Sequence, residues 1–198
     1  MKNILIKEIE SITSFKININ NAVGIFGSAR VNENENYYLL AKESSRLLVE
    51  HGFQIISGGG PGIMKAAIEG SCAAGMKSVA LNINLPFEDN ILPHSKISLN
   101  FDYFMTRKLA FSVYCNAFIA MPGGFGTLDE LFEMLTLMQT RKMRMKPIFL
   151  FGSSFWLGAW SWLQELHKSG FISATDLDNI FITDSVVDVL KILEGKNE

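Results

Sequence analysis

Short apolar segments alternate with segments of helical periodicity along most of this chain, and this alternation limits its fold more than any other feature. The segments 22–27, 53–56, 78–83, 117–121 and 147–151 are apolar almost throughout instead of alternating with polar residues. Strands of this kind are buried on both faces, which is typical of a parallel sheet covered by helices. The sequence therefore predicts an α/β fold, a doubly wound, Rossmann-like parallel sheet that binds ligands beyond the carboxyl ends of its strands.

The length of the chain indicates one domain, because 198 residues fall within the usual single-domain size of about 100–200 residues. We interpret residues 1–21 as an N-terminal extension and residues 22–198 as a single Rossmann-like domain. The spacing of apolar residues, with glycine and proline signals, predicts a short strand at 96–100 and helices near 36–51, 63–74, 103–114, 127–140, 155–168 and 186–194.

Composition excludes several classes of protein. The 18 Lys and Arg residues against 20 Asp and Glu give a net charge of −2, so there is no positive field to hold a nucleic acid. Cys72 and Cys115 lie far apart among apolar neighbours, which indicates buried free thiols and not a disulfide or a zinc site. Residues 1–15 lack the pattern of a signal peptide, and no apolar run is long enough to span a bilayer. We expect a cytoplasmic protein without nucleic-acid or membrane partners.

Three glycine-containing turns each follow a predicted strand and precede a predicted helix. They are Gly27–Arg30, Ser57–Gly62 and Pro122–Thr127, and a parallel sheet brings such turns to one edge. Glycine lets the backbone approach a ligand closely, and a helix N-terminus offers partly positive N–H groups, so these turns suit a phosphate. Any one of them could instead be only a tight connection, but three at one edge favour a phosphate site.

The kind of phosphate ligand follows from two known phosphate-binding motifs that this sequence does not match. Ile63 and Asp129 stand where a dinucleotide-binding G-x-G-x-x-G turn needs its third glycine. The nearest approach to an ATP-binding P-loop, residues 70–78, ends a predicted helix and has Met76 before its lysine. A small monophosphate ester remains as the predicted ligand, and no cofactor is expected.

Polar residues beside the turns allow two interpretations. Thr127 and Glu130 form a T-x-x-E sequence, which either closes a capping box at a helix start or places the threonine on a phosphate. In the second case Glu130 lies about 4.5 Å further along the helix, comparable to the step from a phosphate to its ribose. Arg107 and Lys108, near the start of the helix at 103–114, are either solvated or part of the site.

Other polar and aromatic residues predict structure and not chemistry. The three histidines show no metal-ligand spacing, and no metal site is expected. The basic group at 141–146 is interpreted as a solvated face, and the tryptophans and two methionines as core or subunit interface. The histidines are His51, His94 and His167, and the basic residues are Arg141, Lys142, Arg144 and Lys146. The aromatic and methionine residues are Trp156, Trp160, Trp162, Met134 and Met138.

Three motifs together resemble one known family. Residues Pro122–Glu130 are similar to the PGGxGTxxE signature of the LONELY GUY family, whose cytokinin-activating members are often mislabelled lysine decarboxylases. Gly58–Met64 resembles the family's second glycine motif, and Thr106–Lys108 resembles its Arg-Lys element. The motifs occur in the expected order within residues 22–151, most of the chain.

The resemblance implies a homodimeric nucleoside 5′-monophosphate phosphoribohydrolase, which splits the N-glycosidic bond to give a free base and ribose 5-phosphate without a metal or cofactor. AMP and N6-modified, cytokinin-type AMP both remain open as substrates. Arg107 and Glu130 match the family's catalytic pair, with their separate roles open. The implied substrate-binding residues are Ser28, Gly58, Gly59, Gly60, Met64, Glu88, Lys108, Gly123, Gly124, Phe125, Gly126 and Thr127.

Two other functions stay open. Related Rossmann-like proteins include carriers of the molybdenum cofactor, so the chain could bind a phosphorylated ligand without reaction. The Arg107 and Glu130 pair favours a hydrolase over a carrier. An amino-acid decarboxylase, as the mislabel suggests, needs pyridoxal phosphate on a lysine, and a visible absorbance band would reveal it.

Overall fold

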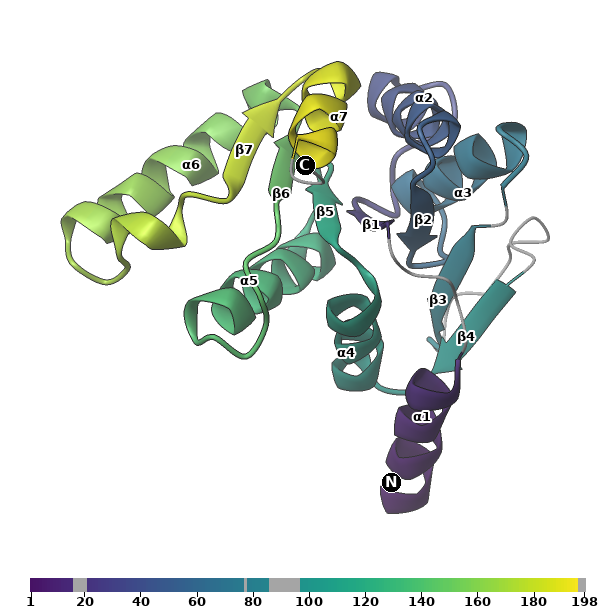
Figure 1. The fold of residues 1–198 in the computed structure, drawn as a ribbon. Helices are drawn as coiled ribbons and strands as arrows, with labels where there is room; N and C mark the ends of the chain where they lie inside the picture. Colours follow the sequence, from purple (N-terminus) through teal and green to yellow (C-terminus); the bar gives the residue numbers. More distant parts are fainter. Residues whose placement is uncertain (16–20, 77, 86–96, 196–198) are drawn as a thin grey trace.

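A single parallel sheet forms the centre of the protein in a computed structural model that describes residues 1–15, 21–76, 78–85 and 97–195. Within those residues its strand order is β4-β3-β2-β1-β5-β6-β7 (Figure 1). All neighbouring strands pair in parallel, which confirms the predicted fold class. The strands are β1 Ala22–Phe26, β2 Gln54–Ser57, β3 Val79–Ile83, β4 Ile97–Phe101, β5 Ala117–Ala120, β6 Ile148–Phe151 and β7 Ile180–Thr183.

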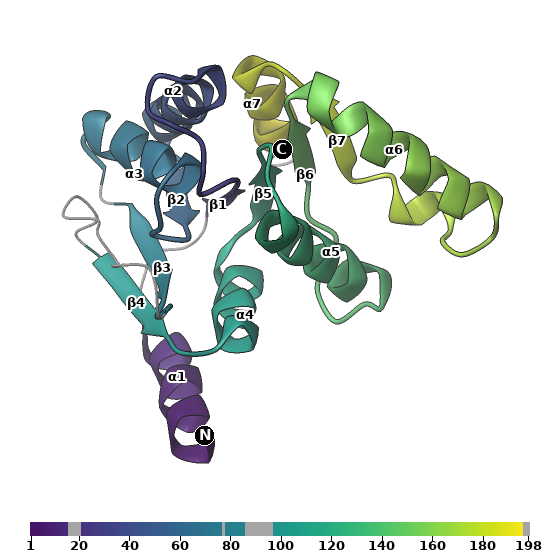
Figure 2. The same cartoon turned by 180° about the vertical axis from the view of Figure 1, so that it is seen from behind.

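Helices cover both faces of the sheet (Figure 2). One buried cluster joins the sheet to α1, α4, α5 and α6, and a second joins it to α2, α3 and α7. No described helix has the combination of length and apolar character needed to cross a membrane. The helices are α1 Lys2–Ser14, α2 Asn36–Glu50, α3 Ile63–Ala73, α4 Phe104–Tyr114, α5 Phe125–Gln139, α6 Ser153–Lys168 and α7 Val186–Glu194, with a short 3-10 helix, η1, at Ala174–Asp176.

The sheet reverses its strand order beside β1. The chain first adds β2, β3 and β4 on one side of β1 and then returns to add β5, β6 and β7 on the other. Loops that leave β1 and β5 therefore diverge to opposite faces, and ligands of doubly wound sheets bind in the crevice that results. This is the place where the first and third glycine turns begin.

Aromatic packing stabilises the strands under this crevice. Phe26 of β1 stacks on Phe118 of β5 with ring centroids 5.6 Å apart, and its edge meets Phe111 of α4 at 4.9 Å. All three side chains are buried. Such pairs contribute about 0.5–1.5 kcal/mol each beyond their burial, so they stabilise the strands from which the loops of the crevice leave.

Besides the short η1, one helix and one strand were not predicted from the sequence. The helix α1 lies within the expected N-terminal extension and packs beside β4 and α4 (Figures 1 and 2). Its Glu8 is buried and accepts hydrogen bonds from the Asp102 amide, at 2.6 Å, and from the Thr106 hydroxyl. At the other end, the Tyr114 hydroxyl donates to the carbonyl of Ile12 at 2.5 Å. The second element is the edge strand β7, which pairs with β6.

Candidate active site

A pocket of about 590 Å³ opens where the three glycine turns meet. Ten of the predicted site residues line it, namely Ser28, Gly58, Gly60, Met64, Arg107, Gly124, Phe125, Gly126, Thr127 and Glu130. The structure thus brings together residues as far apart in the chain as Ser28 and Glu130. Glu88 lies outside the described residues, as does His94.

Backbone hydrogen bonds of one residue, Ser28, hold the three turns together. The Ser28 amide donates to the carbonyl of Pro122 at 3.0 Å, and the Ser28 carbonyl accepts from the amide of Ile63 at 3.0 Å. Gly62 has φ +65°, and a Cβ there would lie 2.3 Å from the Ser28 carbonyl oxygen. Only glycine allows this close approach, because both its left-handed backbone and the missing side chain are needed.

Two helices start at the pocket. α3 begins at Ile63, directly after the second glycine turn, and α5 begins at Phe125, within the third. The first α5 amide that bonds back within the helix is Leu128, which donates to Gly124 at 3.0 Å. The amides of residues 125–127 precede it and have no partner inside the helix, so this end of the pocket suits an anion.

The start of α5 corrects one interpretation of the T-x-x-E sequence. The N-cap is Gly124, so Thr127 and Glu130 both lie inside the helix, and no side chain caps it. The capping-box interpretation is therefore wrong. Thr127 is buried, and a Cβ at Gly123 would come within 2.2 Å of its hydroxyl oxygen. Gly123 thus makes room for Thr127 and does not line the pocket.

Arg107 and Glu130 face each other in the pocket wall. Nη1 of the arginine lies 3.5 Å from Oε1 of the glutamate, and the side chains are only 6% and 13% exposed. Arg107 also donates from Nε to the carbonyl of Leu81 at 2.8 Å and from Nη2 to that of Gly58 at 3.2 Å. These bonds fix the guanidinium, which in turn fixes the position of the carboxylate beside it.

The environment of Glu130 changes its acidity. Burial raises the pKa of Glu130 from its ordinary 4.5 to about 7, although the positive charge of Arg107 acts in the opposite direction. Near neutral pH this carboxyl group therefore exists in both protonation states. A group with such a pKa is suited to accept or release a proton in a reaction.

Besides Gly123, two predicted site residues lie beside the pocket without lining it. Lys108 pairs with Asp129, at 2.9 Å, and with Glu133. Burial lowers the pKa of Lys108, but the hydrogen bonds with Glu133 and Asp129 outweigh this and raise it overall. Gly59 has φ +74°, and a Cβ there would collide with Asn82. Substrate binding by Lys108 and Gly59 stays a prediction.

The sequence interpretation missed part of the lining. Arg30 stands in the first glycine turn, which was itself identified, but the arginine was not assigned to the site. Ile83 ends β3 and Phe104 begins α4, so the rule that ligands bind at carboxyl ends of strands could have found both. The missed lining residues are Gly27, Ala29, Arg30, Ile83, Leu85, Phe104, Leu128 and Asp129.

Comparison with known proteins agrees with this arrangement of loops. Residues 64–193 match the family model described as "Possible lysine decarboxylase". That segment contains the Arg-Lys element and the PGGxGTxxE sequence, which supply Arg107 and Glu130 to the wall of the pocket. The chain belongs to the LONELY GUY family.

Curated LONELY GUY relatives include a cytokinin riboside 5′-monophosphate phosphoribohydrolase of Mycobacterium tuberculosis. It is 29% identical over 157 residues, which are 77% of this chain and 82% of the relative. A protein of the same name from Arabidopsis thaliana is 35% identical over 89 residues, 44% of this chain and 41% of the relative.

A solved structure shows that the fold extends to other functions. The molybdenum cofactor binding protein of the phototrophic bacterium Rippkaea orientalis superposes with a TM-score of 0.67, over 90% of this chain and 98% of that protein. Its sequence identity is 18%, so the likeness establishes the shared Rossmann-like architecture alone.

The name of the family model raises the question of pyridoxal phosphate, which enzymes hold through a Schiff base to a lysine. Within the described residues no lysine lines the pocket. Lys108, which lies next to Arg107, is paired with Asp129 and Glu133. The residues present therefore do not fit pyridoxal phosphate. The described part of the chain also has no group of three or more His, Cys, Asp or Glu placed to hold a metal.

Proposed function

We propose that this LONELY GUY protein hydrolyses the N-glycosidic bond of a nucleoside 5′-monophosphate, giving a free base and ribose 5-phosphate. The observation that carries the proposal is the buried Arg107–Glu130 pair, 3.5 Å apart, in a pocket lined by three glycine turns. The names of the curated relatives support the same class of reaction.

The first part of the reaction is binding of the phosphate. The N–H groups at the start of α5 and the Thr127 hydroxyl offer donors to phosphate oxygens on one side of the pocket. Glu130 lies three residues beyond Thr127 along the same helix, a rise of about 4.5 Å. A ribose attached to that phosphate therefore reaches the carboxylate.

The second part is cleavage at C1′ of the ribose. The bond from C1′ to the base nitrogen breaks, the base leaves with the electron pair, and a water oxygen bonds to C1′. Positive charge develops on the ribose ring, which an ionised Glu130 stabilises. With its pKa raised to about 7 by burial, Glu130 can also accept the proton that the water gives up. The departing base takes up one proton at its nitrogen to become the free base, and Glu130 releases its own, so the overall reaction consumes one water.

Arg107 has two effects in this scheme. Its charge keeps a share of Glu130 ionised, because it opposes the effect of burial on the pKa. It also places a cation at the pocket wall, where it stabilises the negative charge on the departing base.

The base fits the apolar part of the pocket. Met64, Ile83, Leu85 and Phe104 line it, and such side chains suit the flat faces of a purine. We expect AMP and N6-modified AMP both to enter, with the relative rates set by this apolar part.

The test is incubation of the purified protein with a panel of nucleoside monophosphates, with chromatography to identify released bases. We expect base and ribose 5-phosphate in equal amounts, no effect of a chelator, and much slower reaction of adenosine than of AMP, since a nucleoside lacks the anchoring phosphate. Binding of a nucleotide without release of base at any protein concentration would refute hydrolysis and favour a carrier.

We further propose that the protein is a homodimer. Met105, Leu109 and Val113 are 62%, 40% and 55% exposed, and their spacing of four places them on one face of α4. Phe125, at the start of α5, is 93% exposed beside the pocket. An apolar face next to the pocket supports contact through the helices near the Pro122 turn.

A further inference from the structure

Two positively charged side chains line the pocket, and they differ in their partners. Arg107 is bonded to Glu130 and to the carbonyls of Leu81 and Gly58. Arg30 is exposed and, within the described residues, takes part in no ion pair. One cation is thus committed to the protein, while the other is available to a ligand.

The charge of the proposed substrate requires such a cation. A phosphate monoester carries about −1.5 to −2 at pH 7. Arg107 already faces one carboxylate, and Lys108 faces two. A second negative group brought into this pocket needs a counter-charge that these residues do not supply. A guanidinium meets the need well, because its planar fork donates two parallel hydrogen bonds to phosphate oxygens.

The backbone holds Arg30 on the phosphate side of the pocket. Its amide donates to the Ser28 hydroxyl at 3.1 Å, and the Ser28 amide donates to the carbonyl of Pro122 at 3.0 Å. Pro122 begins the turn that leads into α5. The first glycine turn, with Arg30 at its end, is therefore fastened beside the α5 amides at residues 125–127.

We infer that Arg30 binds the 5′-phosphate and makes the enzyme selective for nucleotides over nucleosides. The inference rests on the proposed function. It gives the two arginines separate roles: Arg107 acts at the reacting bond together with Glu130, whereas Arg30 acts only on the phosphate. Loss of Arg30 then weakens binding of the nucleotide and leaves the chemical step intact.

The kinetic test compares Arg30→Gln with the wild type on the nucleoside monophosphate that the wild type cleaves best. We expect KM to rise about 10- to 100-fold, the effect of losing a charged hydrogen bond, with kcat nearly unchanged. The rate on the matching nucleoside should not change, because it lacks the phosphate. Arg30→Lys keeps the charge but not the fork and should recover part of the affinity.

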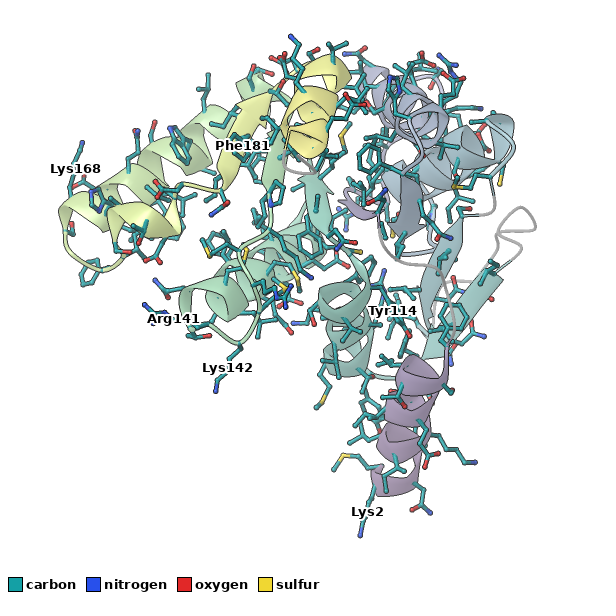
Figure 3. All side chains as sticks on the ribbon, in the orientation of Figure 1. Lys2, Tyr114, Arg141, Lys142, Lys168 and Phe181 are labelled. Atoms are coloured by element: carbon teal, nitrogen blue, oxygen red, sulfur yellow. The ribbon has the colours of Figure 1, made fainter. Side chains whose placement is uncertain are left out.

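A matched control removes the same charge elsewhere. Arg144 is exposed in the loop after α5, outside the pocket lining, and its neighbours Arg141 and Lys142 extend outward from that loop (Figure 3). Arg144→Gln should leave KM at the wild-type value. An equal rise of KM in both variants would show a general effect of net charge and overturn the assignment.

A binding measurement separates this inference from the proposed reaction. Calorimetric titration with ribose 5-phosphate needs no turnover. We expect Arg30→Gln to raise the Kd for ribose 5-phosphate by about the same 10- to 100-fold. If the wild type cleaves no nucleotide but this loss of affinity is found, the proposed hydrolysis fails and the role of Arg30 stands. Wild-type affinity in Arg30→Gln, or no binding of ribose 5-phosphate to the wild type, would overturn the inference.

Discussion

Glu130 is the residue on which the proposed mechanism depends most. Glutamine has the same shape but cannot carry charge, so Glu130→Gln should lower kcat by about 100-fold or more. Nucleotide affinity should stay within about tenfold, or ~1.4 kcal/mol, because phosphate and base contacts are unchanged. Single-turnover kinetics and equilibrium binding measure the two effects. Near-normal turnover in this variant would show that Glu130 takes no part in the chemistry.

The raised pKa of Glu130 also predicts how stability depends on pH. The folded protein holds this proton more tightly than the unfolded chain, whose glutamate has the ordinary value of 4.5, so ionisation of Glu130 destabilises the fold. Its contribution therefore falls as pH rises from about 4.5 through 7. Glu130→Gln removes this dependence. Relative to the wild type, the variant's free energy of unfolding should increase by about 2 kcal/mol between pH 5 and pH 8.

Denaturant titrations of both proteins at pH 5 and pH 8 measure this difference. A constant difference between variant and wild type would show that Glu130 titrates in the folded protein as it does in the unfolded chain. The same titration should appear in the activity, with kcat/KM rising as pH increases through about 7, because the ionised carboxylate is the reactive form.

At the scale of the elements, two glycines on either side of α3 allow a comparison, one in the second glycine turn before the helix and one just after it. Gly62 and Gly75 both have positive φ, +65° and +82°, but a Cβ would meet the Ser28 carbonyl only at Gly62 and has open space at Gly75. Gly75→Ala should cost about 1 kcal/mol, the penalty of the left-handed backbone alone. Gly62→Ala should cost at least about 1 kcal/mol more, from the displaced turn.

Thermal or denaturant unfolding of the two alanine variants gives these values. Ligand binding provides a second readout, since only Gly62 belongs to the turns around the pocket. Equal losses of stability, with nucleotide affinity kept in both variants, would show that the close approach to Ser28 is not needed to form the site.

Much of the fold could be predicted because burial of the strands leaves a direct pattern in the sequence. β1, β5 and β6 are buried at every position and appear as apolar runs. α1 leaves no such pattern, since only Glu8 and Ile12 of it are buried, and the partners of the Glu8 carboxylate, Asp102 and Thr106, are distant in the sequence. The edge strand β7 is buried only at Ile180 and partly exposed at its other three positions, so it lacks the continuous burial that marks β1, β5 and β6.

The candidate site could likewise be predicted only in part from the sequence. The glycine turns could be placed at one edge because strand ends meet there. The position of Lys108 could not, since it depends on Asp129 and Glu133 of another helix. The start of α5 could not be fixed either, because T-x-x-E matches a capping box as well as a helix interior, and the backbone at Gly124 decides between them.

For the whole molecule we expect a homodimer. Light scattering at micromolar concentration should give a mass of about twice 22.1 kDa. Val113→Glu places a charge on the exposed apolar face of α4 and should shift the mass toward the monomer, while circular dichroism stays unchanged. Lys142→Gln, in the exposed loop after α5 (Figure 3), should leave the mass unchanged. A wild type that elutes and scatters as a monomer contradicts the proposal.

The central place of β1 also sets the order in which the protein can form during synthesis. Ala22 of β1 can pair with Gln54 of β2 early, but its other neighbour, β5, begins only at Ala117. Until then one edge of a fully apolar strand lacks its partner, and contacts that span so much chain form slowly. The pocket needs turns from both sides of β1, so it exists only after this late step. A nucleotide would therefore favour the completed fold over every earlier intermediate, and growing chains should gain resistance to proteolysis from ligand only after β5 has emerged.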